Sequence, residues 1–496
     1  MSILGRGWIK DAFWIASATV VSRLLGLVRE VVVADQFGAG GVYDAYLIAF
    51  FIPHFLRRLL AEGALSNAFI PIYKDQLRQN RAEADQFAST VLSAALIVFP
   101  IVVIFGELLA PFLVPLLADG FSQTQQVLAI ELSYLTFPFI ALIGLAAIVM
   151  GILNSHGQFF GPAFAPVMLN VGIIVSVLVF RGLEATSLAI GVLLGGSAQL
   201  LMQLPLLKGK FKFRWHLNFK DESFQQMLKL LLPGILGLAV VQINVLVDNK
   251  LASHLEEGSI SALQFAIRLF QLPLGVFAVA ISTAIFPRLS GEPNETLPPL
   301  RQGVLLCALI LMPASVGLWL LAEGAIQLLF EHGRFTIEDT ARTLNALQFY
   351  VIGMVPYGLV AVLTRAFYSL KDGKSPVFIS AISVAVNVVL ALLLIDVMGV
   401  GGLALSTSVA GWVQLALTWI QLSRSLKGSL IEGISQSLIK SLLATSVMGV
   451  GVWGSLMLVQ QWTVNEFVLV SVPTLVGVLV YSGFVWKDLK QNLEAV

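Results

Sequence analysis

Charged residues are scarce in this chain, and it has a single cysteine. Asp, Glu, Lys and Arg make up 12% of its 496 residues, about half the share that soluble globular proteins carry. Cys307 has no second cysteine to pair with, so an internal disulfide is excluded. The net charge of +1, without a basic tail, argues against a nucleic-acid-binding protein. With 57% hydrophobic residues and a mean hydropathy of +0.88, the composition predicts an all-α integral membrane protein.

The sequence also lacks the motifs of a membrane enzyme. The connections between apolar runs are short, and they carry no HExxH string, no Asp-rich metal cluster and no suitably placed Ser/His/Asp set. His54 and His156 are isolated, and each is better explained as an interface residue than as a catalytic base. We therefore expect no catalytic residues and no required cofactor.

Fourteen stretches are long enough to cross a bilayer as helices, which takes about 20 mostly apolar residues each. The first begins like a signal peptide, but its apolar run is too long and Arg23 and Arg29 interrupt it, so we expect a retained span. The predicted spans lie near residues 8–35, 42–73, 84–117, 125–153, 160–181, 184–206, 225–252, 259–287, 298–330, 341–370, 376–397, 400–423, 434–459 and 464–486.

Basic residues concentrate in the connections on one side of the predicted membrane. The other side has only Arg181, Arg334 and Arg342, together with acidic stretches such as SHLEEGS (253–259). This is the positive-inside pattern, and it predicts that both termini are cytoplasmic. The basic side carries Lys74, Arg78, Arg81, Lys208, Lys210, Lys212, Arg214, Lys220, Arg288, Lys371, Lys374, Arg424, Lys427, Lys487 and Lys490.

Similar stretches recur at an offset of roughly 215 residues. ALSNAFIP (64–71) matches AISTAIFP (280–287), and the surroundings of Asn170 match those of Asn387. Each unit would hold six spans, so the sequence predicts two lobes in the same orientation, related by a parallel pseudo-two-fold repeat. The predicted division is an N-terminal lobe at 1–220, a C-terminal lobe at 221–428 and two extra helices at 429–496.

A further set of charges lies within or at the edges of the predicted spans. An arginine near the centre of a spanning helix costs about 2.5–3.5 kcal/mol, so five facing lipid would cost on the order of 12–17 kcal/mol. We therefore expect these side chains to face a polar interior. The set comprises Arg23, Arg29, Glu30, Asp44, Arg57, Arg58, Glu62 and Arg268.

One-to-one pairing cannot neutralise this set. Arg58 can meet Glu62 one turn later. Arg29 points about 100° away from Glu30, so Asp44 on the next span is the better expected partner. Five positive groups face three negative ones, which leaves at least two arginines without a carboxylate. Guanidinium groups suit phosphate oxygens, and the pattern therefore predicts a cationic, phosphate-sized pocket between the lobes.

Four strings resemble the MurJ/MviN family of lipid II flippases, which belongs to the multidrug/oligosaccharidyl-lipid/polysaccharide exporter fold. The resemblance covers essentially the whole chain, and the arginine-containing strings are its most specific part. They are SRLLGLVRE (22–30), FGAGGVYDAYLIAF (37–50), PHFLRRLLAEGALSNAFIPIY (53–73) and ILNSHGQFFGPAFAPVMLNV (152–171).

The resemblance implies a flippase of the bacterial inner membrane that moves lipid II by alternating access. The last two spans would hold the undecaprenyl tail, the cavity would hold the diphosphate and sugar-peptide headgroup, and cell-wall synthesis machinery would be a further partner. The resemblance also implies roles by position: cavity arginines at Arg23, Arg29, Arg57, Arg58 and Arg268, and cavity carboxylates at Glu30, Asp44 and Glu62.

Some relatives bind a sodium ion, and the resemblance places Asp248, Asn387 and Thr407 at the corresponding positions. Their hard oxygen ligands suit Na⁺, although Ala391 stands where the pattern has a carboxylate. The alternative is that Asp248 pairs with Lys250 or faces the outer interface.

Two other transport functions remain open from the sequence. A drug or cation antiporter of the same superfamily would want net negative charge in the cavity, whereas this set is net positive. An exporter of another polyprenyl-diphosphate oligosaccharide would need the same cationic cavity. The basic, aromatic loop at 206–219 could suggest RNA binding, but a loop beside anionic lipid explains it more simply.

Overall fold

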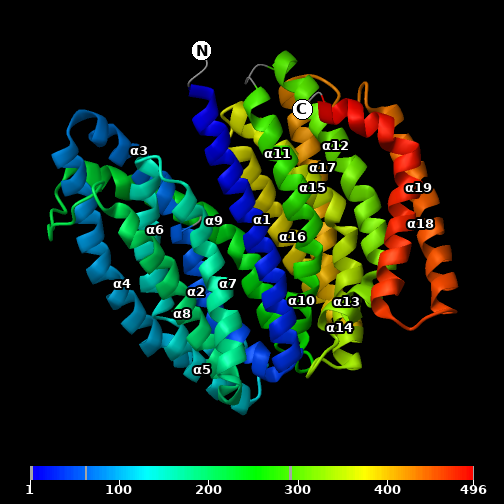
Figure 1. Ribbon diagram of the computed structural model, residues 1–496, viewed down its shortest axis with the longest axis horizontal. Helices are drawn as coiled ribbons and strands as arrows, with labels where there is room; N and C mark the ends of the chain where they lie inside the picture. Colours follow the sequence, from blue (N-terminus) through cyan, green and yellow to red (C-terminus); the bar gives the residue numbers. More distant parts are fainter. Residues whose placement is uncertain (1–3, 62–63, 290–292, 495–496) are drawn as a thin grey trace. The chain divides into compact units, whose positions relative to one another are not determined.

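The computed structural model describes residues 4–61, 64–289 and 293–494, and within these ranges the chain is helical, without a strand (Figure 1). The first part comprises α1 (Leu4–Phe37), α2 (Gly41–Ala61), α3 (Ala64–Gln79), α4 (Arg81–Leu117), α5 (Gln123–Thr136), α6 (Phe139–Ser155), α7 (Phe160–Val179), α8 (Ala185–Gln203) and α9 (Glu222–Ala252). The second comprises α10 (Ser259–Pro273), α11 (Val279–Ile285), α12 (Pro293–Leu320), α13 (Ala322–Phe330), α14 (Ile337–Ile352), α15 (Met354–Ser369), α16 (Lys374–Met398), α17 (Val400–Leu426), α18 (Ser435–Gln460) and α19 (Glu466–Glu494).

Ten helical stretches in the described ranges are long and apolar enough to cross a membrane, or eleven if the bent pair α14–α15 forms one span. The all-helical membrane class expected from the composition is thus confirmed. The predicted spans within α1, α2 and α9 are not among the ten. In α2 the reason is visible, because Asp44, Arg57 and Arg58 all fall within its 21 residues. The charged residues that we expect to face a polar interior are thus the same ones that lower the hydropathy of α2.

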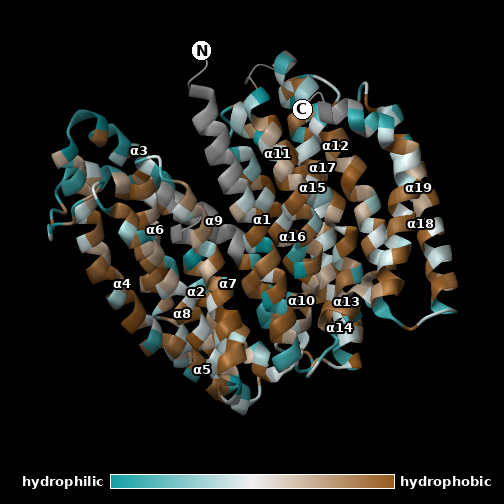
Figure 2. Ribbon diagram, viewed as in Figure 1, coloured by the Kyte–Doolittle hydropathy of each residue, from teal (hydrophilic) through white to brown (hydrophobic). Residues whose placement is uncertain are grey.

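The lipid-facing length of α4 is marked by its exposed side chains. Its first turns are polar, and its exposed large apolar residues begin at Leu96 and continue to Leu116. Figure 2 shows the same change along α4, from hydrophilic near its start to hydrophobic further on. On a helix that is long and apolar enough to cross a membrane, exposed apolar surface of this extent indicates contact with lipid. The membrane–water boundary on α4 therefore lies close to Leu96.

The chain forms two compact units, Met1–Gly258 and Ser259–Val496. Within the first unit, α2 packs on α5, α4 on α6, α6 on α8, and α7 on α8. Within the second, α10 packs on α14, α12 on α15, α15 on α17, and α16 on α17. The same helix pairs therefore recur in chain order, as an internal repeat requires. The three-part division at residues 220 and 428 stays a prediction.

Helices α7 and α8 approach so closely that glycine is needed at their contact. A Cβ atom on Gly172 would lie 2.4 Å from the backbone N of Gly195, and one on Gly191 would lie 2.7 Å from Cα of Ile173. Small residues of this kind let helix backbones meet within membranes, where van der Waals packing replaces the hydrophobic effect. This contact fixes α7, which carries one of the site residues described below.

Several helices contain prolines, each of which leaves one backbone carbonyl without its N–H donor. Side chains from other helices donate hydrogen bonds to these carbonyls. A proline at position i cannot donate to the carbonyl at i−4. The carbonyl of Ala49, released by Pro53, instead accepts a hydrogen bond from the Thr136 hydroxyl at 3.1 Å. The carbonyl of Ile352, four residues before a proline, accepts one from Trp412 Nε1 at 3.1 Å. In a bilayer no water would satisfy these groups, so the kinks depend on their neighbours.

A third such carbonyl fixes the last two helices, which lie side by side in Figure 1. Pro313 lies inside α12, and the carbonyl of Leu309 accepts a hydrogen bond from the Tyr481 hydroxyl of α19 at 2.7 Å. The same hydroxyl lies 2.8 Å from the Ser441 hydroxyl of α18. One tyrosine therefore ties α18 and α19 to the kink of α12.

We predict that Tyr481→Phe lowers the thermal unfolding midpoint of the detergent-purified protein. The change leaves the Leu309 carbonyl without its partner, which costs about 1–3 kcal/mol for a buried polar group. Tyr134→Phe is the matched control, because Tyr134 is 42% exposed. An equal shift in both variants, or none in Tyr481→Phe, would show that this hydrogen bond does not hold the C-terminal helices.

Candidate functional site

The charged residues of α1 form a cluster that α1, α2 and α7 build together. Glu30 is fully buried and forms an ion pair with Arg29, whose side chain is 16% exposed. The Tyr43 hydroxyl of α2 donates to the second oxygen of Glu30 at 3.2 Å. Arg29 Nη1 donates to Oδ1 of Asn170 on α7 at 3.1 Å. A buried carboxylate is stable only when its charge is paired and its oxygens are hydrogen-bonded, and Glu30 meets both conditions.

Asn170 holds α1 as well as the arginine. Its Nδ2 donates to the backbone carbonyl of Ser22 at 3.2 Å, two turns before Arg29. Its side chain thus accepts from the guanidinium and donates to the helix that carries it. Asn170 is 7% exposed, and α1 packs along α7. The direction of the Arg29 guanidinium is therefore set by a neighbouring helix and not by α1 alone.

The expected pairing of Arg29 with Asp44 is wrong. Arg29 pairs with Glu30 instead, because its long side chain turns back toward the adjacent carboxylate while Asn170 fixes its other nitrogen. Asp44 is 2% exposed, and its Oδ2 accepts from the backbone N–H of Gly258 at 2.6 Å. At least one carboxylate oxygen of Asp44 is thus hydrogen-bonded by a backbone N–H group.

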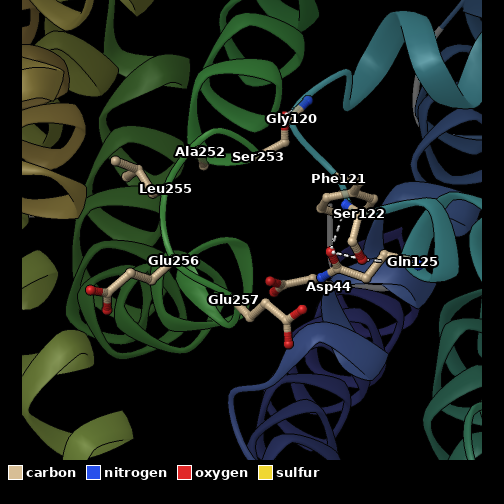
Figure 3. Close-up of a pocket in the computed structure, with 10 residues that line it drawn as sticks. All are labelled: Asp44, Gly120, Phe121, Ser122, Gln125, Ala252, Ser253, Leu255, Glu256 and Glu257. Atoms are coloured by element: carbon tan, nitrogen blue, oxygen red, sulfur yellow. Dashed lines mark hydrogen bonds between the residues drawn. The ribbon is translucent and has the colours of Figure 1, made fainter.

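Asp44 lines a pocket of about 290 Å³ whose walls are acidic and polar. Figure 3 shows Asp44 between Gln125 and the carboxylate of Glu257, with Glu256 further along the same wall. Ser122 and Gln125 bond each other there, as the cap of α5. Three carboxylates around one pocket repel phosphate. This pocket is therefore not the cationic pocket that the sequence predicts.

Aromatic rings connect the Glu30 end of α2 with its arginine end. Tyr43, Tyr46 and Phe50 stack in that order with ring centroids 5.8 Å apart, and the His54 ring follows, tilted, at 5.7 Å from Phe50. The turn after His54 carries Arg57 and Arg58, both half-buried. With a rise of 1.5 Å per residue, about 20 Å along α2 separates Tyr43 from Arg57. Arg29, which lies at the Tyr43 end through Glu30, and the pair Arg57 and Arg58 are therefore at different depths.

Two of the predicted arginines have no carboxylate in the described part of the chain. The side chains of Arg23 and Arg58 are half-buried, and neither forms a hydrogen bond or ion pair with the described residues. Glu62, the expected partner of Arg58, lies outside the described residues.

Arg268 belongs to α10 of the second unit. With the Gln264 amide turned to present its oxygen, Arg268 Nη2 and Nε donate to that oxygen at 2.7 and 3.1 Å. A neutral amide one turn earlier orients this guanidinium without removing its charge.

One contributor to the Glu30 cluster, and one further charge within a predicted span, were not predicted from the sequence. Tyr43 carries no sequence signal for its bond to Glu30. Arg365, half-buried on α15, lies over the ring of Phe286 with 5.6 Å from Cζ to the centroid. Arg365 lies inside the predicted span 341–370. The criterion that selected the other arginines, a charged residue within a predicted span, would therefore have selected Arg365 as well.

The three residues expected at a sodium site lie on different helices. Asp248 of α9 has an oxygen 3.5 Å from Nδ2 of Asn244. Asn387 of α16 is 1% exposed. Thr407 of α17 donates to the Leu403 carbonyl at 3.1 Å, and its own carbonyl accepts from Tyr357 at 3.2 Å. In the searched, described residues no group of three or more His, Cys, Asp or Glu side chains could hold a metal. The oxygen donors still suit Na⁺ chemically.

Comparison with known proteins identifies one family over most of the chain. A family model described as "Lipid II flippase MurJ" matches residues 33–473. A relative from Thermotoga maritima is 36% identical over 444 residues, which cover 89% of each chain. A relative from Vibrio cholerae is 32% identical over 522 residues, which cover 98% of each. Both bear the name "Probable lipid II flippase MurJ".

Solved structures agree with the sequence comparison. The structure titled "Lipid II flippase MurJ, inward closed conformation" matches with a TM-score of 0.85 at 31% identity, over 97% of this chain and 99% of that one. An inward-facing multidrug resistance MATE family transporter matches with a TM-score of 0.70 at 16% identity, over 84% and 98%. The second likeness shows a shared fold alone.

We predict that Glu30→Gln destabilises the protein more than the double variant Arg29→Met, Glu30→Gln. The single change leaves a largely buried guanidinium without its carboxylate, and breaking a buried pair in this way costs about 3–5 kcal/mol. Removing both charges avoids that cost. The measurement is the thermal unfolding midpoint in detergent. If the double variant is as unstable as the single one, the pair is not what balances Arg29.

Proposed function

The chain belongs to the MurJ family of lipid II flippases, and from this membership we propose that its membrane-embedded arginines bind the diphosphate headgroup of lipid II during translocation. Lipid II is the substrate, and the activity is transport within peptidoglycan synthesis, without a covalent step. The protein is not an enzyme. What remains to be assigned is the part that each charged residue plays.

The observation that carries the proposal is that Arg23 and Arg58 have no carboxylate partner among the residues that the structure describes. Each is half-buried and without a hydrogen-bond or ion-pair partner in the described part of the chain. A guanidinium held in a low-dielectric setting gains most from an ionised, forked acceptor, and a diphosphate offers that geometry. The negative charge that none of the described residues supplies would come from the substrate.

Arg29 would act differently from these two, because it already has a carboxylate. Glu30 and Asn170 fix its guanidinium, so its remaining N–H donors are pre-oriented at little entropic cost. We place Arg57 and Arg58 where the headgroup enters from the cytoplasmic side, and Arg29 at a second position further along α2. Two depths suit a substrate that must move and that should not bind too tightly at either one.

The proposed topology has fourteen spans in the bacterial inner membrane, with both termini in the cytoplasm. Twelve spans would form two six-helix lobes that alternate access to a cationic central cavity holding the headgroup, to which Arg268 and the carboxylates Asp44 and Glu62 would also contribute. Support comes from the helix pairs that recur in both units and from the basic residues on one side of the predicted membrane. Cell-wall synthesis machinery is a further proposed partner.

Helices α18 and α19 are proposed to hold the undecaprenyl tail. They carry many exposed apolar side chains, as a lipid-facing surface requires. Their attachment through Tyr481 would keep this surface fixed to α12 while the headgroup moves. The exposed residues include Leu442, Leu443, Val450 and Trp453 on α18 and Phe467, Leu475 and Leu479 on α19.

A sodium ion at Asp248, Asn387 and Thr407 remains a proposal, supported by the hard oxygen donors of these side chains. We expect NaCl to raise the thermal unfolding midpoint above that in KCl of equal concentration, because an ion that binds only the folded state stabilises it. Asp248→Asn should remove this difference. A sodium effect that persists unchanged in Asp248→Asn would place the ion elsewhere.

We predict that Arg23→Ala and Arg58→Ala each slow lipid II translocation by roughly tenfold to a hundredfold. A hydrogen bond to a charged group contributes about 1.5–3 kcal/mol, and 1.4 kcal/mol corresponds to tenfold. The measurement is the rate at which labelled lipid II in proteoliposomes becomes accessible to an impermeant reagent on the opposite face.

Arg78→Ala is the control for this experiment, since the Arg78 side chain is 82% exposed on α3. Its translocation rate should match that of the unmodified protein. Normal translocation by Arg23→Ala and Arg58→Ala, at equal amounts of folded protein, would rule out headgroup binding by these residues. The family assignment would be unaffected.

A further inference from the structure

A basic, aromatic segment connects α8 to α9, and transport of lipid II gives it no role. Residues 208–220, KGKFKFRWHLNFK, contain five Lys or Arg side chains and no Asp or Glu. We call this stretch the interfacial segment. From Phe211 to Asn218 it is neither helix nor turn. In Figure 1 it is part of the unlabelled green loop beside the start of α4.

The interfacial segment is fixed to α4 by its backbone. The N–H groups of Arg214 and His216 donate to the hydroxyls of Ser89 and Ser93, each at 3.2 Å. Arg81 donates to the carbonyls of Gly209 and Lys210 at 2.8 and 2.9 Å. Donors two residues apart thus meet acceptors one helical turn apart. The segment therefore runs along α4 in an extended conformation and is held in register.

Extended backbone places successive side chains on opposite faces, and here the two faces differ in chemistry. One set of alternate residues is apolar and exposed: Phe213 (43%), Trp215 (60%), Leu217 (38%) and Phe219 (56%). The residues between them are basic or polar, and His216 among them lies 2.9 Å from the side chain of Gln86 on α4. The ordered segment thus exposes Phe213, Trp215 and Leu217, while Phe219, in the turn that follows, is exposed but also packs edge-on against the buried ring of Phe224.

The position of this apolar face on α4 indicates what covers it. His216 bonds to Ser93, and the first exposed large apolar residue of α4 is Leu96. Three residues of helix rise about 4.5 Å. The segment therefore lies where the lipid-facing surface of α4 begins. Aromatic side chains are enriched at this level of membrane proteins, and basic groups there meet lipid phosphates.

We propose that the interfacial segment is a binding site for anionic phospholipids in the leaflet on the side where α4 begins. Its apolar face enters the boundary between headgroups and acyl chains, and its Lys and Arg side chains bind the phosphates of lipids with net negative charge. Charge complementarity favours such lipids over zwitterionic ones, whose own amine competes for the phosphate. RNA and protein partners would not account for apolar side chains at the start of a lipid-facing helix.

The first test measures the depth of single nitroxide labels in vesicles of phosphatidylcholine and phosphatidylglycerol that contain no lipid II. Labels replace the residues one at a time, as in Phe213→Cys, Trp215→Cys and Leu217→Cys on the apolar face. Lys212→Cys and Asn218→Cys report the other face. Native Cys307 can stay, because it is fully buried. We expect high oxygen accessibility on the apolar face and high accessibility to a water-soluble nickel complex on the other.

The second test asks whether the segment selects lipid by charge. Lys208, Lys212, Arg214 and Lys220 are changed together to Gln, and retained phosphatidylglycerol is counted against phosphatidylcholine by native mass spectrometry. We expect the preference for phosphatidylglycerol to fall on the order of tenfold. The control changes Lys371, Lys374, Arg424 and Lys487 to Gln, four exposed basic residues elsewhere, and should keep most of the preference.

Three results would overturn the proposal. Equal nickel accessibility on both faces would place the segment in water. Shielding from both oxygen and nickel would mean that the protein itself, in the same chain or a second copy, covers it. An equal loss of phosphatidylglycerol in both charge variants would show that the preference comes from the net charge of the protein and not from the interfacial segment. Unchanged size-exclusion profiles for both variants ensure that the comparison concerns folded protein.

Discussion

Ionised groups inside a membrane must be neutralised by an opposite charge, hydrogen-bonded, or bound by a ligand. The arrangement of charged residues in the first unit of this protein follows from that constraint. Glu30 is fully buried and is answered by Arg29 and Tyr43. One oxygen of Asp44 accepts a hydrogen bond from the backbone N–H of Gly258. Arg23 and Arg58 form no ion pair or side-chain hydrogen bond with the described part of the chain. A lipid diphosphate is a ligand of the chemistry that they require, and this connects the family's activity to particular side chains.

The same constraint governs the uncharged backbone. Three carbonyls that lie four residues before prolines are hydrogen-bonded by Thr136, Trp412 and Tyr481 from other helices. Tolerance of these prolines is therefore a property of helix pairs and not of single helices. In α2, Pro53 lies between Phe50 and His54 of the aromatic row and is followed within the next turn and a half by Arg57 and Arg58. The direction of Arg57 and Arg58 thus depends on a hydroxyl of α5 as well as on α2.

Much of this could be read from the sequence, because hydropathy and charge are local properties. The all-helical membrane class and most of the apolar spans follow from windows of residues, and the arginine-rich strings carried the family resemblance. The count of fourteen spans and the two-lobe repeat stay predictions. The pairing could not be read in the same way. Helix geometry directs Arg29 away from Glu30, but Asn170, 141 residues away in the chain, supplies the second contact that turns the side chain back. Gly258 lies 214 residues from Asp44 and acts through its backbone, which no residue pattern reveals.

The central claim is that arginines with no carboxylate partner among the described residues recognise the diphosphate of the substrate. Its most direct test compares the affinity of purified protein for undecaprenyl diphosphate and for undecaprenol, which has the same tail without phosphates. The unmodified protein should prefer the diphosphate, and Arg23→Gln, Arg58→Gln should lose most of that preference while keeping its affinity for the alcohol. An equal preference in both proteins would contradict the account.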